Sequence, residues 1–209
     1  MTLVPVEELR GLRVAMLRGD FLVPLCELPP LPPPTAAPQA DVQLRAAIRD
    51  VLRQRGYRPT GRGKPSSEYL AGAFADGRWP CINAAVDVAN HVSLDSALPI
   101  SVVDADLVRG LLRIATATEG SAYVFNQGGQ TIDLGGLVCL HDDDGPCANA
   151  VKDAQRTKTG QETRAVLAVV WGCDHGDLAR TERCAAALAT RWRDHGATVS
   201  VIETAIAGG

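Results

Sequence analysis

Residues 78–106, RWPCINAAVDVANHVSLDSALPISVVDAD, decide the fold of this chain. From Ile82 onward, apolar residues recur at intervals of two and four, and polar residues lie between them. This spacing predicts a helix that ends before Pro99, because the residue preceding a proline is disfavoured in the helical region. The apolar positions are Ile82, Val86, Val88, Val92 and Leu94, and the polar ones are Asn83, Asp87 and Asn90.

Downstream of this stretch, short apolar segments separated by glycines predict strands. Residues 134–170, LGGLVCLHDDDGPCANAVKDAQRTKTGQETRAVLAVV, contain two of them. The predicted strands cover residues 121–125, 130–134, 137–141 and 166–171, with a glycine turn at 128–129. A final helix over 177–193, ended by Gly196, leads to a last strand over 197–202.

Upstream of the helix, two further helices and two short strands are expected. Residues 14–25 are apolar apart from an Arg-Gly-Asp interruption at 18–20, which predicts two brief strands around a turn. Asp41 precedes apolar residues at helical spacing, and Gly56 ends that pattern. Ser66 is placed to cap a second short helix.

A proline-rich segment, PPLPPPTAAP at residues 29–38, separates the strands from the first helix. Its missing amide donors and fixed φ angles exclude helix and central strand, so it is expected to form an internal polyproline-like loop. A PxxP recognition ligand is the alternative interpretation. The order of elements predicts one domain over residues 1–209, with an α+β fold in which helices pack on a mixed sheet.

The composition limits the partners and the compartment. The chain has 209 residues, 46% of them hydrophobic, and a formal net charge of −3, so no overall field attracts DNA. No apolar run reaches the roughly 20 residues that cross a bilayer, so we expect no membrane partner and a cytoplasmic location. The six cysteines form no CxxC pair and are expected to be reduced, mostly buried thiols.

Two ordered motifs carry a resemblance to a known family. The first consists of Asn83, VDVANHV at residues 86–92, Pro99 and Asp104. The second is a glycine turn followed by a Thr-to-Leu strand and then by LVCLHDDDGP at residues 137–146. Together they resemble the B3/4 domain of the phenylalanyl-tRNA synthetase beta subunit. Two motifs in the right order are more specific than either alone.

The resemblance implies that the fold is that of a B3/4 domain and that the chain acts on aminoacyl-tRNA. The family domain hydrolyses wrongly charged tRNA, so the implied activity is aminoacyl-tRNA deacylation without a cofactor. The implied ligands are tRNA and a small amino-acid-like group. The chain departs from the family at four places: Ala89 replaces a threonine, Ser101 replaces a histidine, residues 149–155 replace a glycine-rich turn, and residues 166–170 lack the acidic residue expected near the end of the last core strand.

Polar residues near both motifs are the candidates for chemistry. The expected catalytic residues are Asn90, whose amide can bind an ester carbonyl, and Asp153, which can orient a water. Capping or bracing by Asn90, and a solvated loop around Asp153, are the structural alternatives. The expected substrate-binding residues are Asn83, Asp87, Ser101, Lys152 and Arg156.

A local basic surface precedes the first motif. Residues 41–64 contain seven basic and two acidic residues. Arg58, Arg62 and Lys64 are therefore expected to contact RNA phosphates, although exposed arginines are often only solubilising. The run at 141–144 has consecutive carboxylates, which cannot converge on one ion, so no metal site is expected there or elsewhere.

Three functional hypotheses follow. The first is a free-standing editing hydrolase that deacylates mischarged tRNA. The second is a non-catalytic module that binds an amino acid, its derivative or RNA, and the missing histidine, replaced by Ser101, and the missing acidic residue favour it. The third is a structural or protein-interaction role for the proline-rich segment. The chain lacks the ATP-binding motifs of a synthetase, so aminoacylation by this chain alone is excluded.

Overall fold

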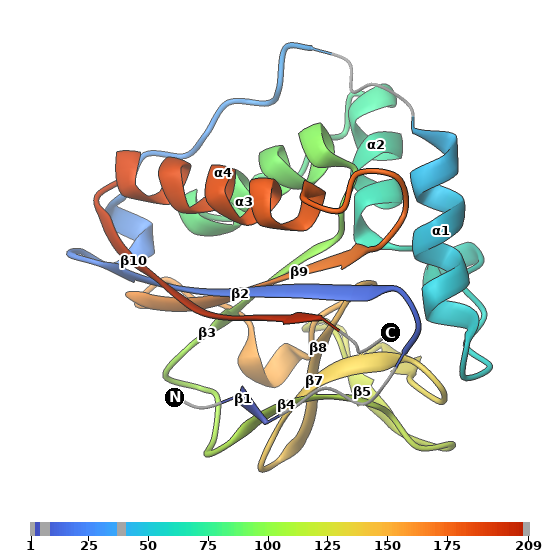
Figure 1. The fold of residues 1–209 in the computed structure, drawn as a ribbon. Helices are drawn as coiled ribbons and strands as arrows, with labels where there is room; N and C mark the ends of the chain where they lie inside the picture. Colours follow the sequence, from blue (N-terminus) through green and yellow to red (C-terminus); the bar gives the residue numbers. More distant parts are fainter. Residues whose placement is uncertain (1–2, 5–8, 37–40, 207–209) are drawn as a thin grey trace.

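The computed structural model describes residues 3–4, 9–36 and 41–206, and Figure 1 shows how their elements are arranged. The helices are α1 (Val42–Arg53), α2 (Ser66–Ala75), α3 (Ala84–Ser96) and α4 (Arg180–Asp194), with short 3-10 turns η1 (Leu25–Glu27), η2 (Gly61–Gly63) and η3 (Gln155–Thr157). The strands are β1 (Leu3–Val4), β2 (Leu12–Phe21), β3 (Ile100–Asp104), β4 (Leu112–Thr116), β5 (Ala122–Val124), β6 (Thr131–Asp133), β7 (Val138–Asp142), β8 (Gly145–Asn149), β9 (Ala165–Cys173) and β10 (Ala197–Ile206).

The strands form two four-stranded sheets and a separate hairpin. Sheet A has the order β1-β4-β7-β8, sheet B has the order β10-β2-β9-β3, and β5 pairs with β6. Sheet A is mixed because β1 runs parallel to β4, whereas all pairs in sheet B are antiparallel. The predicted α+β class is therefore confirmed, with the strands divided among several sheets.

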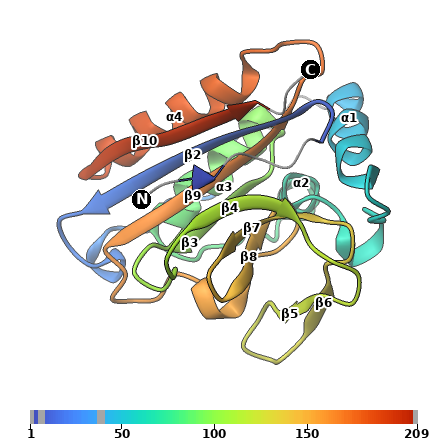
Figure 2. The ribbon, with the colours of Figure 1, turned by 60° about the horizontal axis from the view of Figure 1, so that its bottom comes forward.

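Sheet B is the middle layer of the molecule. The helices cover one face of it and sheet A lies against the other, as Figures 1 and 2 show. Every residue of β9 is buried, which explains why this strand has a continuous apolar sequence instead of alternating polarity. The main hydrophobic core lies on both sides of this strand.

The ends of α1 and α3 are set by side chains that the sequence pattern identifies. The Asp41 carboxylate accepts a hydrogen bond from the Leu44 amide at 2.8 Å, so α1 begins as predicted. Asn83 caps α3 in the same way, accepting from the Val86 amide at 3.1 Å. The predicted helix therefore begins after Ile82, and it ends before Pro99 as expected.

The predicted cap of α2 is wrong. Pro65 occupies the capping position, no side chain caps the helix, and Ser66 is its first residue. The Ser66 amide instead donates to the carbonyl of Ala150 at 2.8 Å. A contact with a distant segment, which the local sequence does not reveal, satisfies this end of the helix.

The predicted break in the N-terminal apolar segment is also wrong. Residues 12–21 form one ten-residue strand, β2, and Gly19 pairs within it with both Val166 and Val199. A Cβ atom on Gly19 would lie 2.9 Å from the Trp192 ring of α4. The glycine therefore marks a close approach of a helix to the sheet and not a turn.

The strands expected at 121–125, 130–134, 137–141 and 166–171 correspond to β5, β6, β7 and β9, and the C-terminal helix and strand are also present. The strands β1, β3 and β8 lie outside the expected set. The β8 sequence GPCAN has weak strand propensity. Within the proline-rich segment, residues 29–36 have no helix or strand, and residues 37–38 lie outside the described residues.

The cysteines agree with a simpler expectation. Four cysteines are buried and two, Cys26 and Cys81, are exposed, and all of them are free thiols. Among the described residues, no helix has both the length and the apolar character that a bilayer-crossing segment needs.

Substituting Gly19 by alanine should destabilise the protein. The added methyl group would meet the fully buried Trp192 ring, which has no room to move, and such overpacking costs about 1–3 kcal/mol. Urea unfolding of Gly19→Ala measures this cost. Gly72 in α2 has open space around its Cβ position, so Gly72→Ala is the matched control and should gain about 0.5–1 kcal/mol. Equal stability of Gly19→Ala and the wild type would contradict the close-approach interpretation.

Candidate functional site

The centre of the candidate site is the turn that follows β8. The Asn149 side chain is buried, and its Oδ1 accepts hydrogen bonds from the amides of Val151 at 2.8 Å and Lys152 at 2.9 Å. Asparagine favours such turns because its carbonyl replaces a backbone acceptor. This turn determines where Lys152 and Asp153 lie.

Ser101 joins this turn to sheet B. Its hydroxyl donates to the Asn149 carbonyl at 2.9 Å and accepts from the Trp171 indole nitrogen at 3.0 Å. The residue is 2% exposed. Its contacts are therefore those of a brace between β3 and β8, which are edge strands of the two sheets.

Asp153 is the titratable group of this site. Its Oδ1 accepts a hydrogen bond from the Asn149 amide at 3.4 Å, and the side chain is partly buried. Burial raises the pKa of Asp153 to about 6, against the opposing effects of the Ser101 hydroxyl and the positive charge of Lys158. A carboxyl group with such a pKa is ionised at neutral pH and still basic enough to accept a proton.

Lys152 lies beside Asp153 in the chain but faces different neighbours. Its ammonium group lies 4.0 Å from the centre of the Phe125 ring, in a cation–π contact. Its backbone carbonyl accepts a hydrogen bond from the Tyr123 hydroxyl, which also accepts one from the Asn149 side chain at 2.5 Å. The β5–β6 hairpin is thereby attached to the turn.

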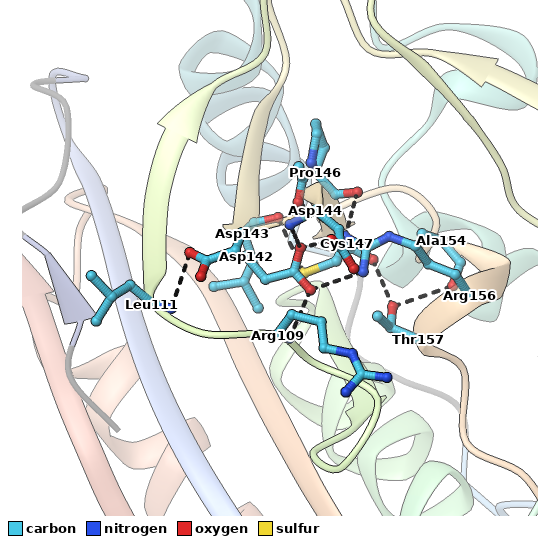
Figure 3. A network of polar contacts seen from close by, with 12 residues as sticks. Arg109, Leu111, Asp142, Asp143, Asp144, Pro146, Cys147, Ala154, Arg156 and Thr157 are labelled. Atoms are coloured by element: carbon cyan, nitrogen blue, oxygen red, sulfur yellow. Dashed lines mark hydrogen bonds and ion pairs between the residues drawn. The ribbon is translucent and has the colours of Figure 1, made fainter.

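Arg156 is committed to a structural ion pair, shown in Figure 3. Its guanidinium donates to both oxygens of Asp142, at 2.8 and 2.6 Å, and to the Gly145 carbonyl at 3.0 Å. The Asp142 side chain is fully buried, and it also accepts from the amides of Arg109 and Asp144. The arginine thus neutralises a buried carboxylate at the β7–β8 turn, away from Asp153.

The polar residues of α3 have separate places. Asn83 caps the helix and donates to the Thr159 hydroxyl at 3.0 Å, which ties α3 to the segment after η3. Asp87 is 1% exposed and accepts from the Ile82 amide at 2.8 Å, and burial raises its pKa. Asn90 is partly buried and has no side-chain hydrogen bond to another described residue.

The expected basic surface divides into two parts. Arg45 and Arg49 pair with Glu68, and Arg53 pairs with Asp50, so these arginines on α1 are partnered. Arg58 and Arg62 line a pocket of about 840 Å³ that also contains Lys152. Lys64 is exposed and lies outside the lining of this pocket.

The structure therefore gathers some of the predicted residues and separates others. Ser101, Lys152 and Asp153 meet around Asn149, and the pocket joins Lys152 to Arg58 and Arg62. Sequence reasoning missed three residues that hold the site together, namely Tyr123, Asn149 and Trp171. Only Asn149 had a local signal, an asparagine three residues before the Lys-Asp pair at the end of a short apolar run.

Replacing Arg156 by methionine should destabilise the protein because it leaves the Asp142 carboxylate buried without its charge partner. Breaking a buried pair costs about 3–5 kcal/mol, and partial exposure of the arginine places the expected loss at about 2–4 kcal/mol. Guanidinium unfolding measures it. Arg183→Met removes an exposed pair with Asp177 and should cost less than about 1 kcal/mol.

The pH dependence provides a second readout for this pair. Burial alone would raise the pKa of Asp142, but hydrogen bonds and the charge of Arg156 outweigh it, so the pKa lies below its ordinary value. The stability that the ionised Asp142 contributes is therefore complete above the ordinary aspartate pKa, and it is lost as the pH falls through the lowered pKa. Arg156→Met should therefore lose less stability than the wild type on acidification. An unchanged free energy of unfolding at neutral pH would contradict the structural role.

Comparison with known proteins identifies the family. The B3/4 domain model matches residues 57–206. Phenylalanine–tRNA ligase beta subunits from Bartonella henselae and Bartonella quintana are 33% and 31% identical over 106 residues, which are 49% of this chain and 13% of either relative. A crystal structure of an N-terminal fragment of the phenylalanyl-tRNA synthetase beta subunit from Pyrococcus horikoshii has a TM-score of 0.49 and 9% identity, covering 95% of this chain and 53% of that one. This chain belongs to the B3/4 domain family.

Proposed function

We propose that this protein binds the aminoacylated end of a tRNA in the cytoplasm and hydrolyses the ester bond when the amino acid is wrong. The observation that carries the proposal is the partly buried Asp153, whose pKa burial raises to about 6. Membership of the B3/4 family supports the choice of an aminoacyl-tRNA as substrate. The chain spans 13% of the two ligase subunits, and ligation is not part of the proposal.

In this mechanism Asp153 is the general base. It accepts a proton from a water molecule as the water oxygen attacks the ester carbonyl carbon. The carbon–oxygen bond to the ribose then breaks, and the ribose oxygen takes the proton held by Asp153, which returns the carboxylate to its ionised form. The neighbouring cations Lys152 and Lys158 favour the negative charge that develops on the carbonyl oxygen.

A non-catalytic binding module is the second candidate, and a specific observation favours it. Ser101 stands where the resemblance implies a histidine, and its hydroxyl is already used by Asn149 and Trp171. One of the expected substrate contacts is therefore occupied by the protein itself. Binding of an amino acid without hydrolysis would raise the melting temperature in a thermal-shift screen while all mischarged tRNAs stay intact.

Asp153→Asn should abolish deacylation, by at least about 100-fold, because general-base catalysis contributes about that factor or more. The wild-type rate should rise with pH around an apparent pKa of about 6 and level off above it, since only the ionised carboxylate accepts a proton. The measurement is release of labelled amino acid from a panel of mischarged tRNAs, with hydrolysis in buffer alone subtracted at each pH.

Asp76→Asn is the matched control, because this exposed carboxylate pairs with Arg78 at the surface and with no other described residue. It should deacylate at the wild-type rate. Absence of deacylation by the wild type on every tRNA of the panel would exclude the hydrolase, and a pH profile without a step near 6 would exclude Asp153 as its base.

A further inference from the structure

A basic pocket lies beside the site of Asp153. Segment 55–63 forms one wall, and the end of β4 and the β5–β6 hairpin form the others. Figure 2 shows this hairpin extending from the molecule next to sheet A. The pocket has a volume of about 840 Å³, which is within the range of sites for a single small ligand.

The charge of this pocket is opposite to that of the whole chain. Four basic residues line it, against two acidic ones, whereas the chain has a net charge of −3. Arg58 and Arg62 are exposed and form no ion pair with other described residues. The acidic residues are Glu119 and Asp133, and the basic ones are Arg55, Arg58, Arg62 and Lys152.

Of the four cations in the pocket, Lys152 has the environment that most favours a bound anion. Its ammonium group is packed over Phe125, and no carboxylate among the described residues pairs with it. Burial lowers its pKa, and the charges of Arg62 and Lys158 lower it further. A partly desolvated cation close to other cations is unfavourable alone, and an anion bound between them would relieve this repulsion.

The walls of the pocket are formed by backbone in close contact. Gly136 has a φ of +74°, and a Cβ atom there would lie 2.1 Å from the Arg55 carbonyl oxygen. Gly63 approaches the buried Tyr57, whose hydroxyl donates to the Gly63 carbonyl at 3.2 Å. These contacts hold the segment with Arg58 and Arg62 against the end of sheet A, so the pocket exists before a ligand binds.

We propose that this pocket is a phosphate-binding subsite for one nucleotide of single-stranded RNA, held by Arg58, Arg62 and Lys152. A pocket of this size takes one unpaired nucleotide and excludes a duplex, and cations beside an aromatic ring are typical of single-strand binding. The identity of the RNA as the end of a tRNA rests on the proposed function. Lys152 lines the pocket and Asp153 follows it in the same turn after β8, so one turn connects the phosphate subsite with the proposed base.

The test measures fluorescence anisotropy of a 3′-labelled hexaribonucleotide with the full chain at several salt concentrations. Arg58→Ala/Arg62→Ala should weaken binding at least tenfold at low salt. The slope of log K against log salt should become less negative by roughly 1.4, since each phosphate contact to a single strand contributes about 0.7. Lys152→Gln should reduce affinity in the same direction.

The matched control is Arg53→Ala/Arg183→Ala, which removes the same charge from two exposed arginines outside the pocket. It should change the affinity no more than twofold. Competition with AMP, adenosine and inorganic phosphate separates the sources of the phosphate. If AMP competes as effectively as the unlabelled hexamer, the ligand is a free nucleotide. This result would keep the phosphate subsite but overturn RNA as the source of the phosphate.

Two results would overturn the subsite altogether. One is wild-type affinity of the Arg58→Ala/Arg62→Ala variant, and the other is competition by adenosine as strong as that by AMP. Asp153→Asn should still bind the hexamer within twofold of the wild type. If the wild type deacylates none of the tRNAs but its RNA binding depends on Arg58 and Arg62, the proposed hydrolase fails and the subsite stands. If the wild type deacylates but its RNA binding does not depend on these residues, the subsite fails and the hydrolase stands.

Discussion

The burial of β9 on both faces is the constraint on which the rest of this structure depends. A strand without a solvent face must be covered by two separate layers, and here the helices supply one and sheet A supplies the other. Trp192 helps to hold the helical layer by packing over Gly19 of β2 and donating to the Ala85 carbonyl of α3 at 3.0 Å. One indole thus connects α4, sheet B and α3.

The candidate site follows from how the two sheets meet. β3 and β8 are the edge strands of sheets B and A, and the Ser101 hydroxyl bonds to the Asn149 carbonyl across this junction. A chain leaving an edge strand is free to turn, and the Asn149 side chain determines that turn. Asp153 is consequently held by a brace between the sheets, and this explains how the carboxyl group stays partly buried without an ion pair to another described residue.

The cations near this site have different roles. Arg156 is used by the buried Asp142 and contributes to folding. Lys152, Arg58 and Arg62 are directed into a pocket without a matching set of carboxylates. The distinction rests on burial of the partner: an arginine beside a buried carboxylate has little freedom for a ligand, whereas unpaired cations around a cavity favour an anion.

Several elements were predictable from sequence because their signals are local. Asp41 and Asn83 cap helices through amides three residues away, α3 ends before Pro99, and the continuous apolar run of β9 identifies a core strand. The turn predicted at Gly19 and the cap predicted at Ser66 were wrong for one shared reason. In both cases a distant residue, Trp192 or Ala150, decides the local structure.

For the site, the sequence by itself identified the residue types and the family motifs, including Asp153, Lys152 and Ser101. Only the tertiary structure decided which of them share a neighbourhood. It placed Arg58 and Arg62 beside Lys152, about 90 positions later in the chain, and gave Arg156 to Asp142. The physical reason is that caps and periodicity act over a few residues, whereas charge pairing and burial depend on which strands become neighbours when the sheets pack.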